Sequence, residues 1–150
     1  MAQSLAKLLT HIIFSTKNRR PVLPAEARAR LNAYFVGILR QWDSPSVIVN
    51  SVADHVHILC RLSKNHALAK VIEEIKKGTS KWLKRQDAAL RDFHWQNGYG
   101  AFSVSQSNVD QVRRYIERQE AHHRTTTFED EFRAFLAKHR IEFDERYLWD

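Results

Sequence analysis

The chain has 150 residues, of which 43% are hydrophobic, and this size and apolar content suit one compact domain spanning residues 1–150. With only 4 Gly, 3 Pro and no low-complexity stretch or internal repeat, the sequence excludes the disordered, fibrous and solenoid classes. A net charge of +7 raises the local concentration of polyanions and is a first, weak indication of a nucleic-acid partner.

The first half of the chain predicts a strand, a helix and a hairpin. Residues 8–19, with the sequence LLTHIIFSTKNR, are rich in β-branched and aromatic side chains and end in a polar turn cluster, which is typical of a strand. Pro24 occupies a first helical position, and the apolar residues that follow recur at a spacing of 3.6 up to Trp42, so a helix is expected there. Segments 47–52 and 55–62 then predict two strands joined by a tight connection.

The second half predicts a long helix, a strand and further helices. Helical periodicity returns over residues 67–85, and residues 93–106 are rich in aromatic side chains and end in alternation, which favours a fourth strand. Ser107 followed by Asp110 matches a capping box opening a helix that carries QVRRYIERQEAHH, and a last helix carries FEDEFRAFLAKHR. The order predicts an α+β fold, a ferredoxin-like split β-α-β-β-α-β antiparallel sheet with helices on one face, plus C-terminal helices.

The N-terminal segment and the cysteine content indicate a cytoplasmic protein. In MAQSLAKLLTHIIFSTKNRR most basic residues follow the apolar ones, which is the reverse of a secretory signal. The longest uninterrupted apolar run, residues 33–39, is far too short to cross a bilayer, so no membrane partner is expected. The single cysteine, Cys60, allows no internal disulfide, as is usual in the cytoplasm.

Two histidines stand one residue apart in the predicted strand VADHVHILCRL, residues 52–62. Side chains at i and i+2 of a strand share a face, so His55 and His57 lie side by side and their ring nitrogens can converge on one cation. If the residues between and after them form the buried set, the histidines occupy the sheet face that helices leave open. A chance pair at a sheet surface is the competing interpretation, and a divalent cation requires at least one further donor.

The helix predicted after Ser107 carries a second candidate pair. Tyr115 and Gln119 are four residues apart, which places them on one helix face with Gln119 one turn beyond Tyr115. Tyr115 lies at the border of the apolar stripe of this helix. Taken alone, the pair is more simply interpreted as a boundary aromatic residue and a solvated amide.

Together these segments resemble the single-tyrosine HUH transposases of the most compact bacterial insertion sequences. DHVHIL is similar to their HUH motif, with Val56 as the hydrophobic middle residue, and YIERQ is similar to their tyrosine helix. The resemblance continues in order through FSTKNRRPVL, IKKGTSKWLK, FHWQNGYGAFSVS, QEAHH and TFEDEF, and therefore covers most of the chain.

The resemblance implies a metal-dependent tyrosine transposase, that is, a DNA strand transferase. It implies that His55, His57 and Gln119 bind Mg²⁺ or Mn²⁺ and that Tyr115 is the catalytic nucleophile. It also implies single-stranded DNA with hairpins at the element ends as the substrate, a 5′-phosphotyrosine intermediate, and no nucleotide cofactor, since one ester is exchanged for another. The same resemblance implies a homodimer in which the tyrosine helix of one subunit can serve the metal site of the other, with residues 105–108 as the hinge where this helix changes partner. Whether the tyrosine acts within its own subunit or on the partner's site stays open at this point.

These residue types suit that chemistry. Two neutral imidazoles and an amide oxygen leave the charge of a bound cation undiminished, so the cation can polarise a phosphate. A tyrosine hydroxyl has an ordinary pKa of about 10 and must lose its proton to attack well, which a nearby cation favours.

Other residues of the same types are assigned lesser roles. Tyr34 and Tyr147 are expected to pack, and Tyr99 to stack or join the core, because no ligand-type residue lies at a spacing that would bring a cation to it. His122 and His123 follow Gln119 by three and four and are expected to support the ligands or contact DNA, with plain solvent exposure as the alternative.

Basic residues in a turn and along two helices are the expected phosphate contacts, although each lysine is explained equally well as part of a solvated helix face. Trp95 and Phe102 are better explained by core packing than by base stacking. The predicted DNA-binding residues are Lys17, Arg19, Arg20, Lys77, Lys81, Lys84, Arg85, Arg114 and Arg118.

Two alternative functions remain open at this point. The first is a non-catalytic regulator that binds single-stranded nucleic acid on the same fold. Sheets of that kind normally expose aromatic residues on the central strands, where this chain has His55 and His57, and this difference favours the enzyme. The second is a structural zinc protein, which is disfavoured because the chain has one cysteine and the third candidate ligand is an amide.

Overall fold

A computed structural model describes residues 2–150, in which four strands form one antiparallel sheet in the order β2-β3-β1-β4. Both β1 and β2 pair antiparallel with β3, so they run in the same direction with β3 inserted between them. This is the split β-α-β arrangement that the sequence predicts. The strands are β1 (Leu8–Ser15), β2 (Ser46–Ser51), β3 (His55–Leu62) and β4 (Gly100–Ser103).

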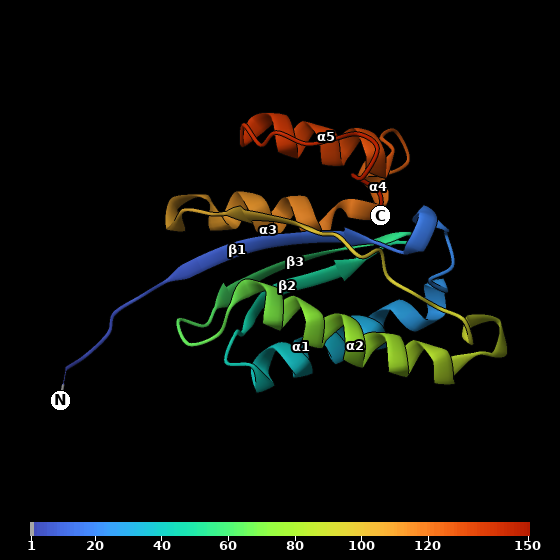
Figure 1. The fold of residues 1–150 in the computed structure, drawn as a ribbon, viewed down its shortest axis with the longest axis horizontal. Helices are drawn as coiled ribbons and strands as arrows, with labels where there is room; N and C mark the ends of the chain where they lie inside the picture. The colour runs from blue at the N-terminus through green and yellow to red at the C-terminus, as the bar shows by residue number, and fades with distance from the viewer. Residues whose placement is uncertain (1) are drawn as a thin grey trace.

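Helices cover both faces of the sheet (Figure 1). On one face lie α1 (Arg28–Gln41) and α2 (Leu68–Gln86), and on the other α3 (Val109–Glu117), α4 (Gln119–His122) and α5 (Phe128–Lys138). The α+β fold is therefore confirmed. The prediction that the histidines stand on an open face is wrong, because the C-terminal helices fold back over them.

Strand alternation separates two clusters of apolar side chains. Ile12 of β1 and Ile58 of β3 point into the larger core beneath α1 and α2, where Phe35 and Ile75 are fully buried. The smaller cluster lies beneath α5, whose Phe128, Phe132 and Leu136 recur every four residues and pack with Ile13 and Phe102. An apolar stripe of this kind is stable in water only when covered, which explains why α5 docks on the sheet.

Two predicted strands are shorter than expected. Beyond β1 the chain forms a 3₁₀ turn, η1 (Lys17–Arg19), with left-handed backbone at Asn18 (φ 58°). Before β4, the buried Gln96 accepts a hydrogen bond from the Ser15 amide at 2.7 Å. Lys76 Nζ donates to the carbonyl oxygens of residues 96, 97 and 98 at 2.8–3.2 Å. These bonds hold the segment as an irregular connection.

The remaining helical boundaries also differ from the sequence pattern. Short 3₁₀ turns flank the long helices: η2 (Ala25–Ala27), η3 (Ala88–Leu90) and η4 (Gln106–Asn108). The predicted capping box is wrong, because Ser107 Oγ bonds Ser105 Oγ at 3.0 Å and α3 begins only at Val109. A break at Arg118 (φ −97°, ψ 16°) separates α3 from α4. None of the helices described is both long and apolar enough to span a bilayer.

Gly100 lets α5 approach the sheet. A Cβ atom at this position would lie 2.5 Å from Cε2 of Phe132, so a methyl group there pushes α5 outward. We expect Gly100→Ala to lower the free energy of unfolding by about 1–3 kcal/mol, as overpacking usually does. The matched control is Gly37→Ala in α1, where a Cβ meets nothing within 4 Å and the helix gains up to about 1 kcal/mol. Urea denaturation measures the free energy of unfolding of both variants. Equal changes in Gly100→Ala and Gly37→Ala would contradict the close approach of α5 to the sheet at Gly100.

Candidate active site

Strand β3 positions His55 and His57 with their rings toward α3, α4 and α5. Both side chains are completely buried, and their ring centroids are 5.1 Å apart. The predicted shared face is therefore correct, although that face is a helix-covered interior. A strand that is hydrogen-bonded on both edges holds two such rings more rigidly than a loop would.

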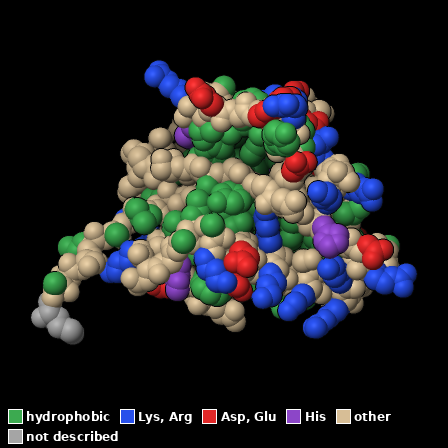
Figure 2. All heavy atoms as spheres, in the orientation of Figure 1, with side chains coloured by type: hydrophobic (Ala, Val, Ile, Leu, Met, Phe, Trp, Pro, Cys, Tyr) green, Lys and Arg blue, Asp and Glu red, His purple; other side chains and the backbone are tan. Residues whose placement is uncertain are grey.

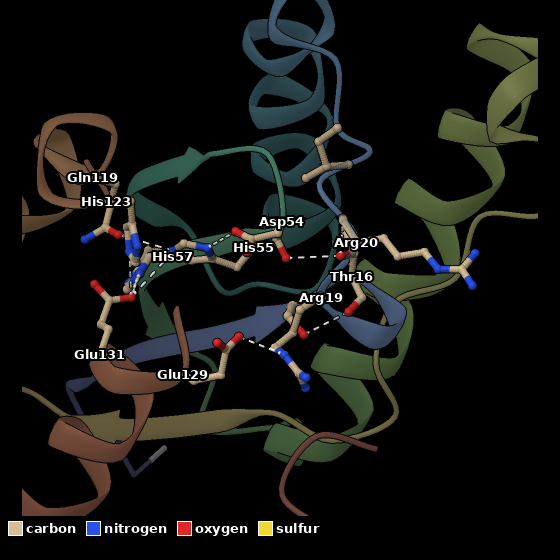
Figure 3. Close-up of polar contacts among 12 residues, drawn as sticks. Thr16, Arg19, Arg20, Asp54, His55, His57, Gln119, His123, Glu129 and Glu131 are labelled. Carbon is tan, nitrogen blue, oxygen red and sulfur yellow. Dashed lines mark hydrogen bonds and ion pairs between the residues drawn. The ribbon is translucent and has the colours of Figure 1, made fainter. Parts of the chain in front are cut away.

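A glutamate from α5 lies at the centre of the imidazoles (Figure 3). The Oε1 atom of Glu131 lies 2.9 Å from His57 Nε2, 3.1 Å from His123 Nε2 and 3.5 Å from His55 Nε2. One possible ligand atom from each of these four residues lies within 4.8 Å of all the others. Segments that are more than 70 residues apart in the sequence thus meet in one polar cluster.

The Nδ1 atoms of His55 and His57, on the ring edge away from Glu131, also have hydrogen-bond partners. His55 Nδ1 lies 2.7 Å from Asp54 Oδ1, and His57 Nδ1 lies 2.8 Å from His11 Nε2. Burial, followed by the neighbouring His57, holds the pKa of His11 well below its usual value, so His11 is neutral and Nε2 can accept the proton of His57 Nδ1. With their Nδ1 protons facing Asp54 and His11, His55 and His57 could direct their Nε2 lone pairs at a cation, whereas without one the other tautomer of His57 lets its Nε2–H donate to Glu131 Oε1 at 2.9 Å.

Gln119 completes the set from the start of α4. It is fully buried, its Oε1 lies 3.3 Å from His55 Nε2, and its Nε2 lies 3.4 Å from the Tyr115 carbonyl oxygen. Gln119 therefore lies beside the histidines, as the resemblance implies, and the break at Arg118 does not carry it away from them.

Tyr115 reaches the cluster from α3 of the same chain. Its hydroxyl donates a hydrogen bond to Glu131 Oε2 and lies 3.4 Å from His122 Nε2. Its ring centroid is 5.9 Å from that of His57. Burial, together with the Glu131 carboxylate, raises the pKa of Tyr115 above its ordinary value, so the phenol is protonated in this arrangement.

The donor set fits a divalent cation. Burial by itself would raise the pKa of Glu131, but the contacts with His123 and His57 outweigh it and keep the carboxylate anionic. His123 Nε2 is buried without a hydrogen-bond partner among residues 2–150, because its contact with Glu131 is poorly aligned. A buried anion ringed by imidazole nitrogens, one of them unpaired, is an arrangement that a cation would stabilise.

Two cavities open beside Tyr115. One, of about 520 Å³, lies between α3 and α5 and is lined by His11, Val112 and Lys138 among others. The second lies against α3 and α4 and is lined by Arg114 and Arg118. Two of the predicted DNA-binding residues therefore stand next to the tyrosine.

The other predicted DNA-binding residues lie elsewhere. Exposed lysines and arginines gather over α2 in Figure 2, on the sheet face opposite the histidines. Lys17 and Arg20 line a separate cavity of about 320 Å³ with His94. Arg19 pairs with Glu129 of α5 at 2.7 Å and lies over the Trp149 ring, so it is already engaged within the chain. The α2 group consists of Lys77, Lys81, Lys84 and Arg85.

The competing tyrosines lie away from the cluster. Tyr34 is 42% exposed but stacks on Trp82, as a packing residue does. Tyr147 is 64% exposed, so the prediction that it packs is wrong. Tyr99 lies near Lys76, far along the chain from the histidines, and Trp95 and Phe102 are buried as predicted.

Glu131 was not recognised as a site residue from the sequence, and His123 was given only a supporting role. The signal for Glu131 is its position on the last helix, since it is three residues from Phe128 and next to Phe132 and so lies on the buried stripe. A charged residue on a buried stripe is costly unless it is paired, and this marks it as a candidate site residue.

Comparisons with known proteins identify the family of this chain and agree with its fold. The family model described as "Transposase IS200 like" matches residues 4–119. A solved structure of a candidate transposase from Deinococcus radiodurans R1 is 24% identical with a TM-score of 0.61, and the match covers 79% of this chain and 98% of that one. A REP-associated tyrosine transposase bound to a REP hairpin is 16% identical with a TM-score of 0.57, and the match covers 82% of this chain and 73% of that one. The comparison with curated proteins gives no match. At these identities the two structures support the fold alone.

Acid should destabilise the metal-free protein through His57. Burial lowers the pKa of His57 to about 4, against an opposing contribution from Glu131, whereas the unfolded chain titrates near 6.5. Between those values the unfolded state binds a proton that the folded state does not, so the free energy of unfolding falls as pH drops from 6.5 to 4, by about 3 kcal/mol from this group.

Urea denaturation of chelator-treated protein across this pH range measures the effect. His57→Gln should reduce the slope by about 1.4 kcal/mol per pH unit, while His94→Gln, at an exposed side chain, retains it. An unchanged slope in His57→Gln would show that this imidazole is not the group responsible.

Proposed function

Because the chain belongs to the IS200-like transposase family, we propose that residues 1–150 act as one domain that cleaves and rejoins single-stranded DNA at insertion-sequence ends. The observation that carries this proposal is the hydroxyl of Tyr115 lying against Glu131 beside the buried histidines of its own chain. Phosphoryl transfer requires a nucleophile, ligands that can bind a cation and basic residues that bind phosphate, all within one site.

The reaction exchanges one phosphoester for another. The Tyr115 oxygen forms a bond to the scissile phosphorus, and the bond from phosphorus to the 3′ oxygen breaks, leaving a 5′-phosphotyrosine link and a 3′ hydroxyl. The phenol proton passes first to its hydrogen-bond acceptor, Glu131 Oε2, which then releases it to solvent, and the departing 3′ oxygen takes up a proton from water. Attack by a 3′ hydroxyl in the reverse direction rejoins the strand, so no nucleotide cofactor is needed.

His55, His57 and Gln119 are the residues that would hold Mg²⁺ or Mn²⁺. When bound, such a cation polarises the phosphate and stabilises the charge that develops on its oxygens. Asp54 and His11 fix the ring orientation of the two histidines through their Nδ1 atoms. Removal of the cation with EDTA is therefore expected to stop cleavage.

Arg114 and Arg118 are placed to bind the phosphates that flank the scissile one, because they line a cavity that also contacts Tyr115. The basic residues of α2, on the other sheet face, would bind a more distant part of the DNA. A hairpin next to the cleavage site offers such a part, and a structural neighbour is itself a tyrosine transposase bound to a REP hairpin. We also propose that the protein works as a homodimer.

Tyr115→Phe should abolish the covalent DNA adduct, because it removes the attacking oxygen. His57→Ala should reduce the adduct by about 100-fold or more through loss of the cation. The assay mixes the protein with end-labelled single-stranded DNA from the flanks of its own gene plus Mn²⁺ and separates products on a denaturing gel.

Tyr34→Phe is the matched control for this experiment, since Tyr34 stacks on Trp82 of α2, on the sheet face opposite the histidines, and it should retain full activity. An adduct that survives in Tyr115→Phe would assign the nucleophile to another residue and contradict the proposal.

A further inference from the structure

Two additional residues stand where the proposed ligands converge, on elements that the tyrosine motif does not include. His123 follows α4 and Glu131 belongs to α5. Resting on the function proposed above, we infer that His123 Nε2 and Glu131 Oε1 bind the cation together with His55, His57 and Gln119, and that this five-donor site prefers a first-row transition-metal dication over Mg²⁺.

The distances support shared coordination. Two ligands of one ion lie at most about 4.4 Å apart, which is twice a typical bond of about 2.2 Å. The candidate atoms of His55, His57, His123 and Glu131 all lie within 4.8 Å of one another, and the Oε1 atom of Gln119 is 3.3 Å from His55 Nε2. The ligand atoms therefore need to move only slightly closer together to bind one ion.

Burial gives an independent argument. The Glu131 side chain is 2% exposed, and its partners are imidazoles that carry no obligatory positive charge. An ionised carboxylate in such surroundings is costly unless a cation offsets its charge. The buried Nε2 of His123 is the second observation, because it lies 3.1 Å from Glu131 Oε1 without forming a well-aligned hydrogen bond within residues 2–150, and a metal ion would give this nitrogen a partner.

The donor chemistry decides the class of cation. Three imidazole nitrogens with one amide and one carboxylate oxygen form a borderline set, whereas Mg²⁺ is a hard ion that prefers oxygen ligands and retains several waters. Affinity at nitrogen-rich sites rises from Mn²⁺ to Co²⁺, and both should exceed Mg²⁺.

Glu131 would then connect the ion to the nucleophile. One carboxylate oxygen, Oε1, faces the imidazoles, and the other, Oε2, accepts the hydrogen bond of Tyr115. Glu131 therefore fixes the tyrosine oxygen relative to the cation, and a bound ion would tether α5 to β3.

Isothermal titration calorimetry of the chelator-stripped full chain tests this inference with Co²⁺, Mn²⁺ and Mg²⁺ as probes. We expect one ion per chain, the affinity order Co²⁺ > Mn²⁺ > Mg²⁺, and at least about 10-fold weaker Co²⁺ binding in His123→Ala and in Glu131→Gln. The matched controls are His94→Ala, at an exposed imidazole outside the cluster, and Glu129→Gln, at a carboxylate that pairs with Arg19 instead of the histidines, and both should bind like the wild type. The Co²⁺ absorption bands should change in the first two variants and not in the controls.

The outcomes separate the inference from the proposed function. If His57→Ala loses Co²⁺ while His123→Ala and Glu131→Gln bind normally, the three-ligand site stands and the inference is wrong. Tighter binding in Glu131→Gln would also overturn it, since the carboxylate would then be obstructing the ion. If His57→Ala binds like the wild type, the proposed site itself fails. Circular dichroism of each metal-free variant verifies folding.

Discussion

The buried carboxylate of Glu131 is the contact on which the arrangement of the site depends. One oxygen meets His57 of β3 and the other meets Tyr115 of α3, so a single side chain of α5 joins three elements. Removing a partner of a buried hydrogen-bonded group costs about 1–3 kcal/mol, and more when the group left behind is charged, as this carboxylate is. The position of Tyr115, the proposed nucleophile, and the docking of the last helix therefore depend on the same side chain.

The two faces of the sheet perform different tasks. Beneath α1 and α2 the packing is almost entirely apolar, with Ile58 and Phe35 fully buried, and this core gives β3 a rigid support. The opposite face presents histidines from the same strand, and the smaller cluster around Phe132 covers only part of it. Because side chains alternate along a strand, the rigid core and the polar site can be built from adjacent residues.

Much of this arrangement follows from sequence periodicity and spacing. The order of strands and helices and the shared face of His55 and His57 can be predicted in this way, whereas the proximity of Gln119 to them is implied only by the resemblance to the HUH transposases. The docking of α5 cannot, since an apolar stripe shows that a helix is covered but does not identify the covering surface. The short β4 also escapes prediction, because bonds from Lys76 to backbone carbonyls have no sequence period.

Anomalous diffraction from crystals grown with Mn²⁺ tests the central claim most directly, because it locates the cation relative to the nucleophile. The account predicts one peak within coordination distance of His55 Nε2 and His57 Nε2, with the Tyr115 hydroxyl of the same chain facing it across Glu131. Absence of a peak between these histidines, or a Tyr115 that lies remote from the ion within its own chain, would contradict it.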